Sequence, residues 1–299
     1  MKRRDFLRLT ALTSLSVAIG VDNRTNQAFG AAPAYDLAVV TGASPQKITS
    51  AAIDALGGMT TFVKRGDVVV VKPNIGWDRT PEYAANTNPE VVAAIVRLCL
   101  EAGAKKVKVF DRSVNDPRRC YVQSGIADAV KKAGGEVSYI DERKFRDVKI
   151  NGSVLKSWPL YTELMEADKV INVPIAKHHG LSRLTLGMKN WMGVMGGSRA
   201  SIHQKINESL VDISMAIKPT LVVLDAVRVL TANGPQGGNL KDVKKLDTIV
   251  AGVNQVAVDA YGATLFGMKS SDLGYVRIAA QNGFGPMDTA RMKIRKISI

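Results

Sequence analysis

Lysines and histidines are concentrated in one segment of this chain, and these residue types bind anions, ligate metals and move protons. All three histidines lie within residues 177–203, together with two lysines. A lysine at a partly enclosed site holds negative charge, whereas a neutral imidazole ligates a metal or accepts a proton. We therefore predict catalytic roles for Lys177, His178, Lys189 and His203, and metal ligation by His179 and His203.

Further polar residues follow the strands that the sequence predicts. Lys72 and Asn74 come at the end of an apolar run over 67–72, Asp111 ends a strand over 107–111, and Asp225 follows one over 220–224. Open parallel α/β sheets bind ligands beyond the carboxyl ends of their strands. The residues expected to hold the ligand or to complete the coordination shell of a bound metal are Lys72, Asn74, Asp111, Asn190, Asp225 and Asp259.

The elements that must position these residues form an alternating pattern of β-branched runs and helical segments. This alternation is typical of an α/β fold with a mostly parallel central sheet, helices on both faces and a ligand crevice at the strand carboxyl ends. No linker interrupts residues 31–299, so a single α/β domain is expected there. We predict strands at 37–41, 67–72, 107–111, 137–140, 169–173, 220–224, 248–251 and 293–297, a β-hairpin within 143–158, and helices at 45–56, 88–102, 121–133, 255–266 and 273–282.

A local signal places His203 in a helix. Ser201 and Gln204 have the spacing of a capping box, which puts His203 in the first helical turn. The positive end of the helix dipole disfavours an imidazolium ion there, so a neutral His203 is expected. Gly196, Gly197 and the free N–H groups of this helix start are also suited to an anion.

The first residues, 1–30, resemble a twin-arginine (Tat) export signal. The sequence Lys2-Arg3-Arg4-Asp5-Phe6-Leu7-Arg8 precedes an apolar stretch over 9–21, which is too short to span a bilayer. Small residues offer cleavage after Gly30 or after Ala34, and the sequence does not decide between them. We expect a periplasmic or other extracytoplasmic location, with the Tat translocase as a partner during export and no membrane span in the mature chain.

Composition narrows the classes of partner. Lys and Arg number 41 against 27 Asp and Glu, giving a formal net charge of +14, and 46% of residues are hydrophobic. The positive residues are scattered and the chain is expected outside the cytoplasm, so nucleic acid is not expected as a partner, whereas a small anionic ligand suits the charge. The 2 cysteines, Cys99 and Cys120, leave one disulfide open but cannot hold an iron–sulfur cluster through thiolates alone.

One combination of motifs is similar to a known family. Lys177-His178-His179-Gly180-Leu181, Thr185 and Gly187-Met188-Lys189-Asn190-Trp191-Met192-Gly193 resemble the hallmark of domain-of-unknown-function family 362. The resemblance extends from residue 37 to 283. Many relatives carry Tat signals and ferredoxin-type iron–sulfur domains, but this chain lacks CxxC motifs, so no iron–sulfur cluster is expected. The supporting matches are Lys72-Pro73-Asn74, Asp225, Asn233-Gly234-Pro235 with Gly238, and Val256-Ala257-Val258-Asp259.

A second resemblance concerns spacing alone. His179, Lys189 and His203 are spaced much as a histidine, a lysine and a second histidine are in the lactate racemase family, where the lysine carries a nickel pincer cofactor and a histidine binds the nickel. The resemblance implies a metal-bearing ligand at these positions. The cofactor is otherwise unknown, and a metal ion is one option.

Two classes of function follow. The first is an exported protein that binds an anionic or metal-bearing ligand in a Lys/His/Asp pocket, with redox-linked catalysis among its options. The alternative is a non-catalytic envelope cofactor carrier or an accessory subunit of a redox complex. A catalytic site requires a pocket with proton-transfer groups within reach, whereas a docking protein requires an exposed apolar patch or an open basic face.

Overall fold

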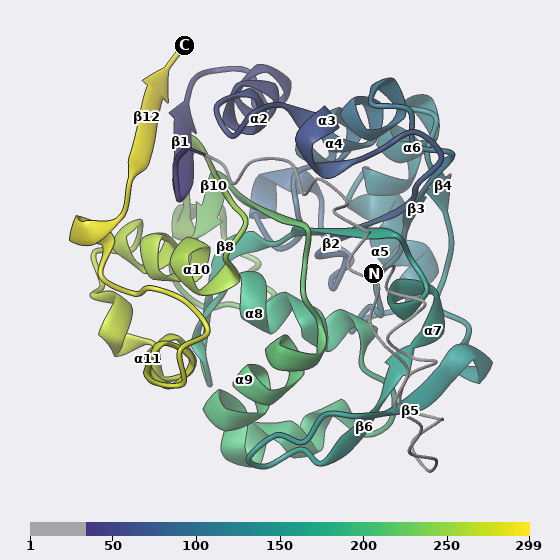
Figure 1. Cartoon of the computed structure of the whole chain (residues 1–299), viewed down its shortest axis with the longest axis vertical. Coiled ribbons are helices and arrows are strands. Elements are labelled where there is room, and N and C mark those ends of the chain that lie inside the picture. Colours follow the sequence, from purple (N-terminus) through teal and green to yellow (C-terminus); the bar gives the residue numbers. More distant parts are fainter. Residues whose placement is uncertain (1–33) are drawn as a thin grey trace, which may run out of the picture.

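A central sheet of ten strands runs through the computed structural model, which describes residues 34–299 (Figure 1). The predicted export signal at residues 1–30 lies outside the described residues. The strands of this sheet are β1 (Leu37–Thr41), β2 (Val68–Pro73), β3 (Lys106–Val109), β4 (Glu136–Val137), β7 (Lys169–Val173), β8 (Ile175–His179), β9 (Arg183–Thr185), β10 (Leu221–Leu230), β11 (Val243–Gly252) and β12 (Ile294–Ser298).

The sheet is mostly parallel, as predicted. Its order is β12-β1-β11-β10-β7-β2-β3-β4, and β8 pairs with β10 and β9. Within residues 34–299, every pair of neighbouring strands in this sheet is parallel except those that involve β9 or β11. The parallel strands β10, β7, β2 and β3 therefore end on one edge, where ligands bind in folds of this class.

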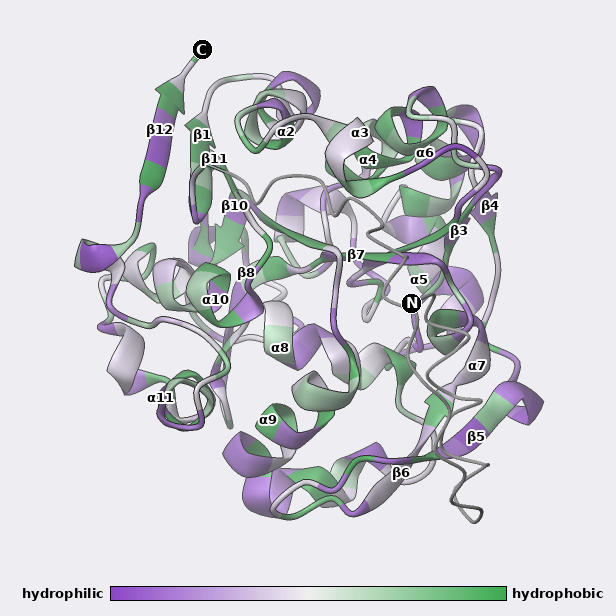
Figure 2. Ribbon diagram, in the orientation of Figure 1, coloured by the Kyte–Doolittle hydropathy of each residue, from purple (hydrophilic) through white to green (hydrophobic). Residues whose placement is uncertain are grey.

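Helices cover both faces of the sheet, and each face has its own apolar core (Figures 1 and 2). One core is packed by α2 (Pro45–Asp54), α3 (Met59–Phe62), α4 (Pro89–Glu101), α5 (Pro117–Gln123) and α6 (Ile126–Lys132). The other is packed by α7 (Thr162–Met165), α8 (Gly187–Asn190), α9 (Ile206–Ala216), α10 (Gln255–Thr264) and α11 (Gly274–Gln281). Short 3₁₀ helices occupy Pro81–Tyr83, Glu142–Lys144, Trp191–Val194, Arg199–Lys205, Leu240–Asp242, Ser270–Asp272 and Thr289–Arg291.

Local sequence signals account for several of these elements. Ser44 caps α2 by accepting a hydrogen bond from the N–H of Lys47, and Asn88 caps α4 by accepting from Glu90, with a proline following each cap. Val69, Val70 and Val71 of β2 are buried because the strand is covered on both faces. The predicted hairpin is confirmed as β5 (Phe145–Lys149) paired antiparallel with β6 (Ser157–Tyr161).

Two helix predictions are wrong in detail. The helix predicted over 121–133 is split into α5 and α6, because Gly125 adopts the left-handed conformation with φ of 70°. The capping box predicted at Ser201 does not form, since the hydroxyl of Ser201 donates to the carbonyl of Ser198 and α9 begins only at Ile206. His203 therefore lies within the 3₁₀ helix Arg199–Lys205, outside the first turn of an α-helix.

Across residues 34–299, no helix combines the length and the apolar character needed to cross a membrane.

Candidate functional site

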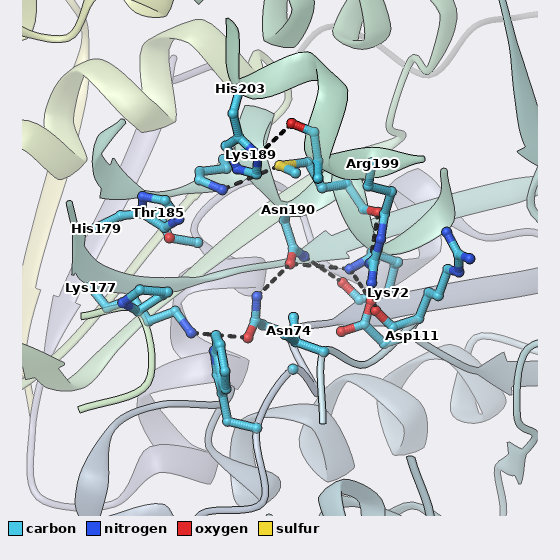
Figure 3. Close-up of a pocket in the computed structure, with 18 residues that line it drawn as sticks. Lys72, Asn74, Asp111, Lys177, His179, Thr185, Lys189, Asn190, Arg199 and His203 are labelled. Carbon is cyan, nitrogen blue, oxygen red and sulfur yellow. Dashed lines mark hydrogen bonds and ion pairs between the residues drawn. The ribbon is translucent and has the colours of Figure 1, made fainter. Parts of the chain in front are cut away.

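A cavity of about 240 Å³ lies at the carboxyl ends of β2 and β3 and beside the β8–β9 hairpin (Figure 3). Side chains from β2, β8, β9, α8 and the 3₁₀ helix Arg199–Lys205 meet there, although they are far apart in the sequence. The lining residues are Lys72, Asn74, Gly76, Trp77, Asp111, Arg112, Val114, Lys177, His179, Thr185, Lys189, Asn190, Met192, Gly193, Arg199, Ala200, His203 and Pro235.

A buried ion pair forms one side of the cavity. Lys72 is completely buried, and its Nζ lies 2.8 Å from Oδ1 of Asp111, the second residue after β3. The other oxygen of Asp111 accepts a hydrogen bond of 2.6 Å from the N–H of Ile75. Burial lowers the pKa of Lys72, while Asp111 acts in the opposite direction. A Cβ at Gly193 would overlap both members of the pair, so a glycine is needed there.

Three asparagines extend this pair into a hydrogen-bonded network, and Figure 3 shows Asn74 and Asn190 of this network. Oδ1 of Asn190 accepts hydrogen bonds from Lys72 at 3.1 Å and from Nδ2 of Asn74 at 3.2 Å. Nδ2 of Asn190 donates to Oδ1 of Asn172 at 2.8 Å, and Asn172 in turn donates to the carbonyl of Gly187. Because these buried amides are satisfied by one another, the network holds a fixed geometry before any ligand binds.

Two other lysines of the cavity have no carboxylate partner within residues 34–299. Lys177 is 1% exposed and donates to the carbonyl of Ala85 and to Oδ1 of Asn74. Lys189 is 7% exposed, and its Nζ contacts the sulfur of Met192 at 3.2 Å. Burial lowers the pKa of Lys177 to about 7, helped by the charge of Lys189, and lowers the pKa of Lys189 to about 8.

The two histidines of the cavity present opposite hydrogen-bonding groups. Nδ1 of His179 accepts from the N–H groups of Leu181 and Ser182 at 3.1 and 3.3 Å, so the proton of this ring lies on Nε2. Burial, with the neighbouring lysine charges, lowers the pKa of His179 to about 3 and keeps the ring neutral. Nδ1 of His203 lies 3.0 Å from the carbonyl oxygen of Ala200, which only accepts, so the neutral ring has its lone pair on Nε2.

This arrangement bears on the predicted metal ligands. The rings of His179 and His203 are nearly parallel, with centroids 6.4 Å apart. Metal ligation by His179 does not fit its geometry, because its Nδ1 is already bonded to two N–H groups and its Nε2 carries the proton. Within residues 34–299, no group of three or more His, Cys, Asp or Glu side chains is placed to hold a metal ion, whereas zinc sites use three or four protein ligands.

Three predicted residues lie outside the cavity lining. Successive side chains of a strand point to opposite faces, so Lys177 and His179 of β8 face the cavity while His178 faces away, with its Nδ1 accepting from the N–H of Gly234 at 3.1 Å. Asp225 lies in the middle of β10 and accepts from the N–H groups of Asn88 and Val227 at 2.7 and 2.9 Å. The sequence placed it at a strand end because β10 extends six residues further than the predicted limit at 224.

Asp259 supports the cavity from behind. Its carboxylate accepts from the N–H groups of Gly187 and Met188 at 2.7 and 2.9 Å, at the start of α8, which carries Lys189 and Asn190. Burial raises the pKa of Asp259 to about 7, although these two hydrogen bonds oppose the shift. Asp259 therefore orients the helix that supplies cavity residues and does not itself face a ligand in the cavity.

Comparison with known proteins places the chain in a family. Residues 69–264 match the family described as domain of unknown function (DUF362). The chain belongs to the DUF362 family. A thylakoid-associated protein of Synechocystis sp. is 33% identical over 199 residues, covering 64% of this chain and 61% of that protein. The match thus spans less than two thirds of this relative's length.

Two solved structures resemble this DUF362 chain distantly. The lactate racemase apoprotein from Thermoanaerobacterium thermosaccharolyticum has a TM-score of 0.45 at 11% identity, with 64% of this chain and 50% of that chain covered. A protein from Thermotoga maritima has a TM-score of 0.45 at 13% identity, with 81% of this chain and 60% of that chain covered.

Two arginines and a threonine of the cavity were not among the site residues predicted for this DUF362 member. Arg199 is half-buried, and its guanidinium donates to the carbonyls of Arg112, Ser113 and Met192. Arg112 in turn donates to the carbonyls of Met195 and Gly197, so the two arginines hold the segment before His203 against the end of β3. The third is Thr185, whose place in the family motif was the only signal available.

Proposed function

We propose that this protein binds a small anionic molecule in the cavity. The observation that carries the proposal is the presence of two buried ammonium groups, Lys177 and Lys189, without a carboxylate partner within residues 34–299. A buried charge without a counter-charge is costly, and an anionic ligand supplies that counter-charge. The cavity is smaller than the pockets of about 300–1,000 Å³ that hold drug-sized molecules, which favours a ligand of a few heavy atoms.

The groups around the ligand are suited to proton transfer. The pKa values of Lys177 and Lys189, about 7 and about 8, lie near neutral pH, where a general acid or base is most effective. The neutral form of His203 presents a lone pair on Nε2, and His179 presents a fixed N–H donor. We infer that His203 acts as the base and Lys177 as the acid in a proton transfer on the bound anion. The alternative function, a non-catalytic carrier or an accessory subunit of a redox complex, predicts anion binding without turnover.

A metal-bearing anion is the second candidate ligand. The lone pair that the neutral His203 ring presents on Nε2, near Lys189, favours it (Figure 3). The metal would arrive as part of the ligand, because the described side chains do not form a group of three suitable ligands. Elemental analysis of the exported protein tests this candidate: we expect a stoichiometric metal that is absent from His203→Ala, and a metal-free wild-type protein rejects it.

Calorimetric titration with phosphate and with acetate at pH 6.5 tests the anion site. We expect saturable binding to the wild-type protein that Lys177→Met and Lys189→Met each weaken at least about tenfold, the loss expected for one charge-assisted contact. Lys131→Met, which removes an exposed lysine of α6, is the matched control and should bind as the wild type does. Equal weakening in all three variants would indicate a general effect of net charge and would reject the site.

We also propose that the chain is exported through the Tat pathway. The support is the sequence Lys2-Arg3-Arg4-Asp5-Phe6-Leu7-Arg8 and the short apolar stretch that follows it. Replacing Arg3 and Arg4 together with lysine keeps the charge but removes the twin-arginine pair. In cell fractions we expect the wild-type chain outside the cytoplasm, cleaved after Gly30 or Ala34 by intact mass, and the double variant uncleaved in the cytoplasm. Equal distribution of the two proteins rejects Tat export.

A further inference from the structure

The face of the β8–β9 hairpin that borders the cavity contains an unpartnered hydroxyl. Lys177 and Thr185 are directly opposite each other in the antiparallel pair, and His179 follows Lys177 on the same face. Thr185 is 4% exposed, lines the cavity, and its Oγ1 has no hydrogen-bond partner within the described residues. Leaving a buried hydroxyl unbonded is unfavourable, so its position at a cavity points to a ligand atom as the missing partner.

Two further donors at this wall lack an oxygen acceptor within residues 34–299. His179 is fixed in the tautomer that carries the proton on Nε2, because its Nδ1 accepts two backbone hydrogen bonds. Lys189 reaches the same wall from α8, and within the described residues its Nζ contacts only the thioether of Met192, a weak acceptor. Figure 3 shows Thr185, His179 and Lys189 together at one end of the cavity, away from Asp111.

The opposite end of the cavity is occupied by groups that satisfy one another. Lys72 and Asp111 are paired, and Asn190 accepts hydrogen bonds from Lys72 and from Asn74. The carboxylate of Asp111 also repels a negatively charged group placed beside it. The charged end of an anion is therefore directed toward the donors at the hairpin wall.

We infer that Thr185, His179 and Lys189 form an oxyanion subsite that binds the terminal oxygens of a carboxylate or phosphoryl group. This inference rests on the proposed function, since it names the residues that receive the anion. The hydroxyl, the imidazole N–H and the ammonium are three donors, and a carboxylate or phosphoryl group offers the two or three acceptor oxygens that they lack. The hydroxyl of Thr185 can rotate to donate to either group, whereas the N–H of the neutral His179 points in one fixed direction.

The test compares calorimetric titrations of the purified protein with inorganic phosphate and with acetate at pH 6.5 and constant ionic strength. Thr185→Val keeps the shape of the side chain and removes the hydroxyl, and Thr185→Ser restores the hydroxyl. The matched control is Ser209→Ala, which removes another buried and unpartnered hydroxyl, in α9 and outside the cavity lining. We expect affinity to fall about tenfold in Thr185→Val for the preferred anion, to stay within about threefold in Thr185→Ser, and to be unchanged in Ser209→Ala.

The two anions distinguish a carboxylate subsite from a phosphoryl one, because the larger loss in Thr185→Val marks the group that the hydroxyl contacts. Absence of binding of either anion to the wild-type protein overturns the proposed function and this subsite together. Wild-type binding that is retained in Thr185→Val overturns the subsite alone. A second measurement does not depend on the variants: the side-chain ¹⁵N signal of His179 Nε2 should shift on titration of the wild-type protein, and an unchanged signal at saturation overturns the subsite.

Discussion

Replacing Lys189 with methionine should stabilise the protein in the absence of anions. Burial lowers the pKa of Lys189 from its ordinary 10.5 to about 8, so the folded state disfavours the charged form that the unfolded state accepts. A difference of this size corresponds to about 3 kcal/mol, at ~1.4 kcal/mol per pKa unit. Methionine fills a similar volume without a charge, so the variant should regain most of that free energy of unfolding at pH 6.5.

The sign of the pH dependence follows from the same pKa values. Below pH 8 both states of the wild-type protein carry the proton on Lys189, and the full penalty is present. Between pH 8 and 10.5 the folded state loses the proton while the unfolded state keeps it, so the penalty declines with rising pH. The advantage of Lys189→Met should therefore be largest at pH 6–7 and should decrease toward pH 10.

Urea unfolding followed by tryptophan fluorescence, in buffers without phosphate or carboxylate anions, measures this effect. The matched control is Lys72→Met, because Lys72 is paired with Asp111 at 2.8 Å and its removal leaves a buried carboxylate without a counter-charge. Breaking a buried pair in this way costs about 3–5 kcal/mol. Two identical substitutions in one cavity should thus change stability in opposite directions. A Lys189→Met protein that is less stable than the wild type at pH 6.5 would refute the reasoning.

Three further outcomes are expected. Sulfate should bind at least about tenfold more tightly at pH 6 than at pH 9, because Lys177 and Lys189 lose their protons with pKa values of about 7 and about 8 in the ligand-free protein. The charge of sulfate is constant over this range, so titrations at several pH values report the lysines, and an affinity that does not change with pH contradicts the prediction. Cys99 and Cys120 are free and buried, and burial raises the pKa of both thiols, that of Cys120 to about 11. Mass spectrometry should therefore show no reaction of either thiol with iodoacetamide at pH 8 until urea unfolds the chain. Rapid labelling of the native protein would contradict this. Gly193→Ala should lower the melting temperature by several degrees and weaken anion binding, because its methyl group would overlap the buried ion pair of the cavity. Scanning calorimetry measures the melting temperature, and calorimetric titration measures anion binding. An unchanged melting temperature would show that the side chains around Gly193 move to accommodate the methyl group.

The sequence alone determined most of the fold, because the signals that specify its elements are local. The apolar run of β2 and the capped starts of α2 and α4 each depend on a few neighbouring residues. In a parallel α/β fold, the strand ends then bring polar residues together, and this reasoning placed Lys72, Asn74 and Asp111 correctly at the cavity. The clustering of Lys177, Lys189 and His203 within residues 177–203 also predicted one site, and all three line the cavity.

Only the tertiary structure decided what each of these residues does there. Lys72 and Lys189 have the same side chain, but one meets a carboxylate from β3 and the other does not, and this depends on contacts between distant segments. The register of the β8–β9 hairpin directs His178 away from the cavity and brings Thr185 into it. Burial and pairing are properties of the packed chain, so the pKa values of the lysines, the tautomer of His179 and the place of Thr185 follow from the assembled fold.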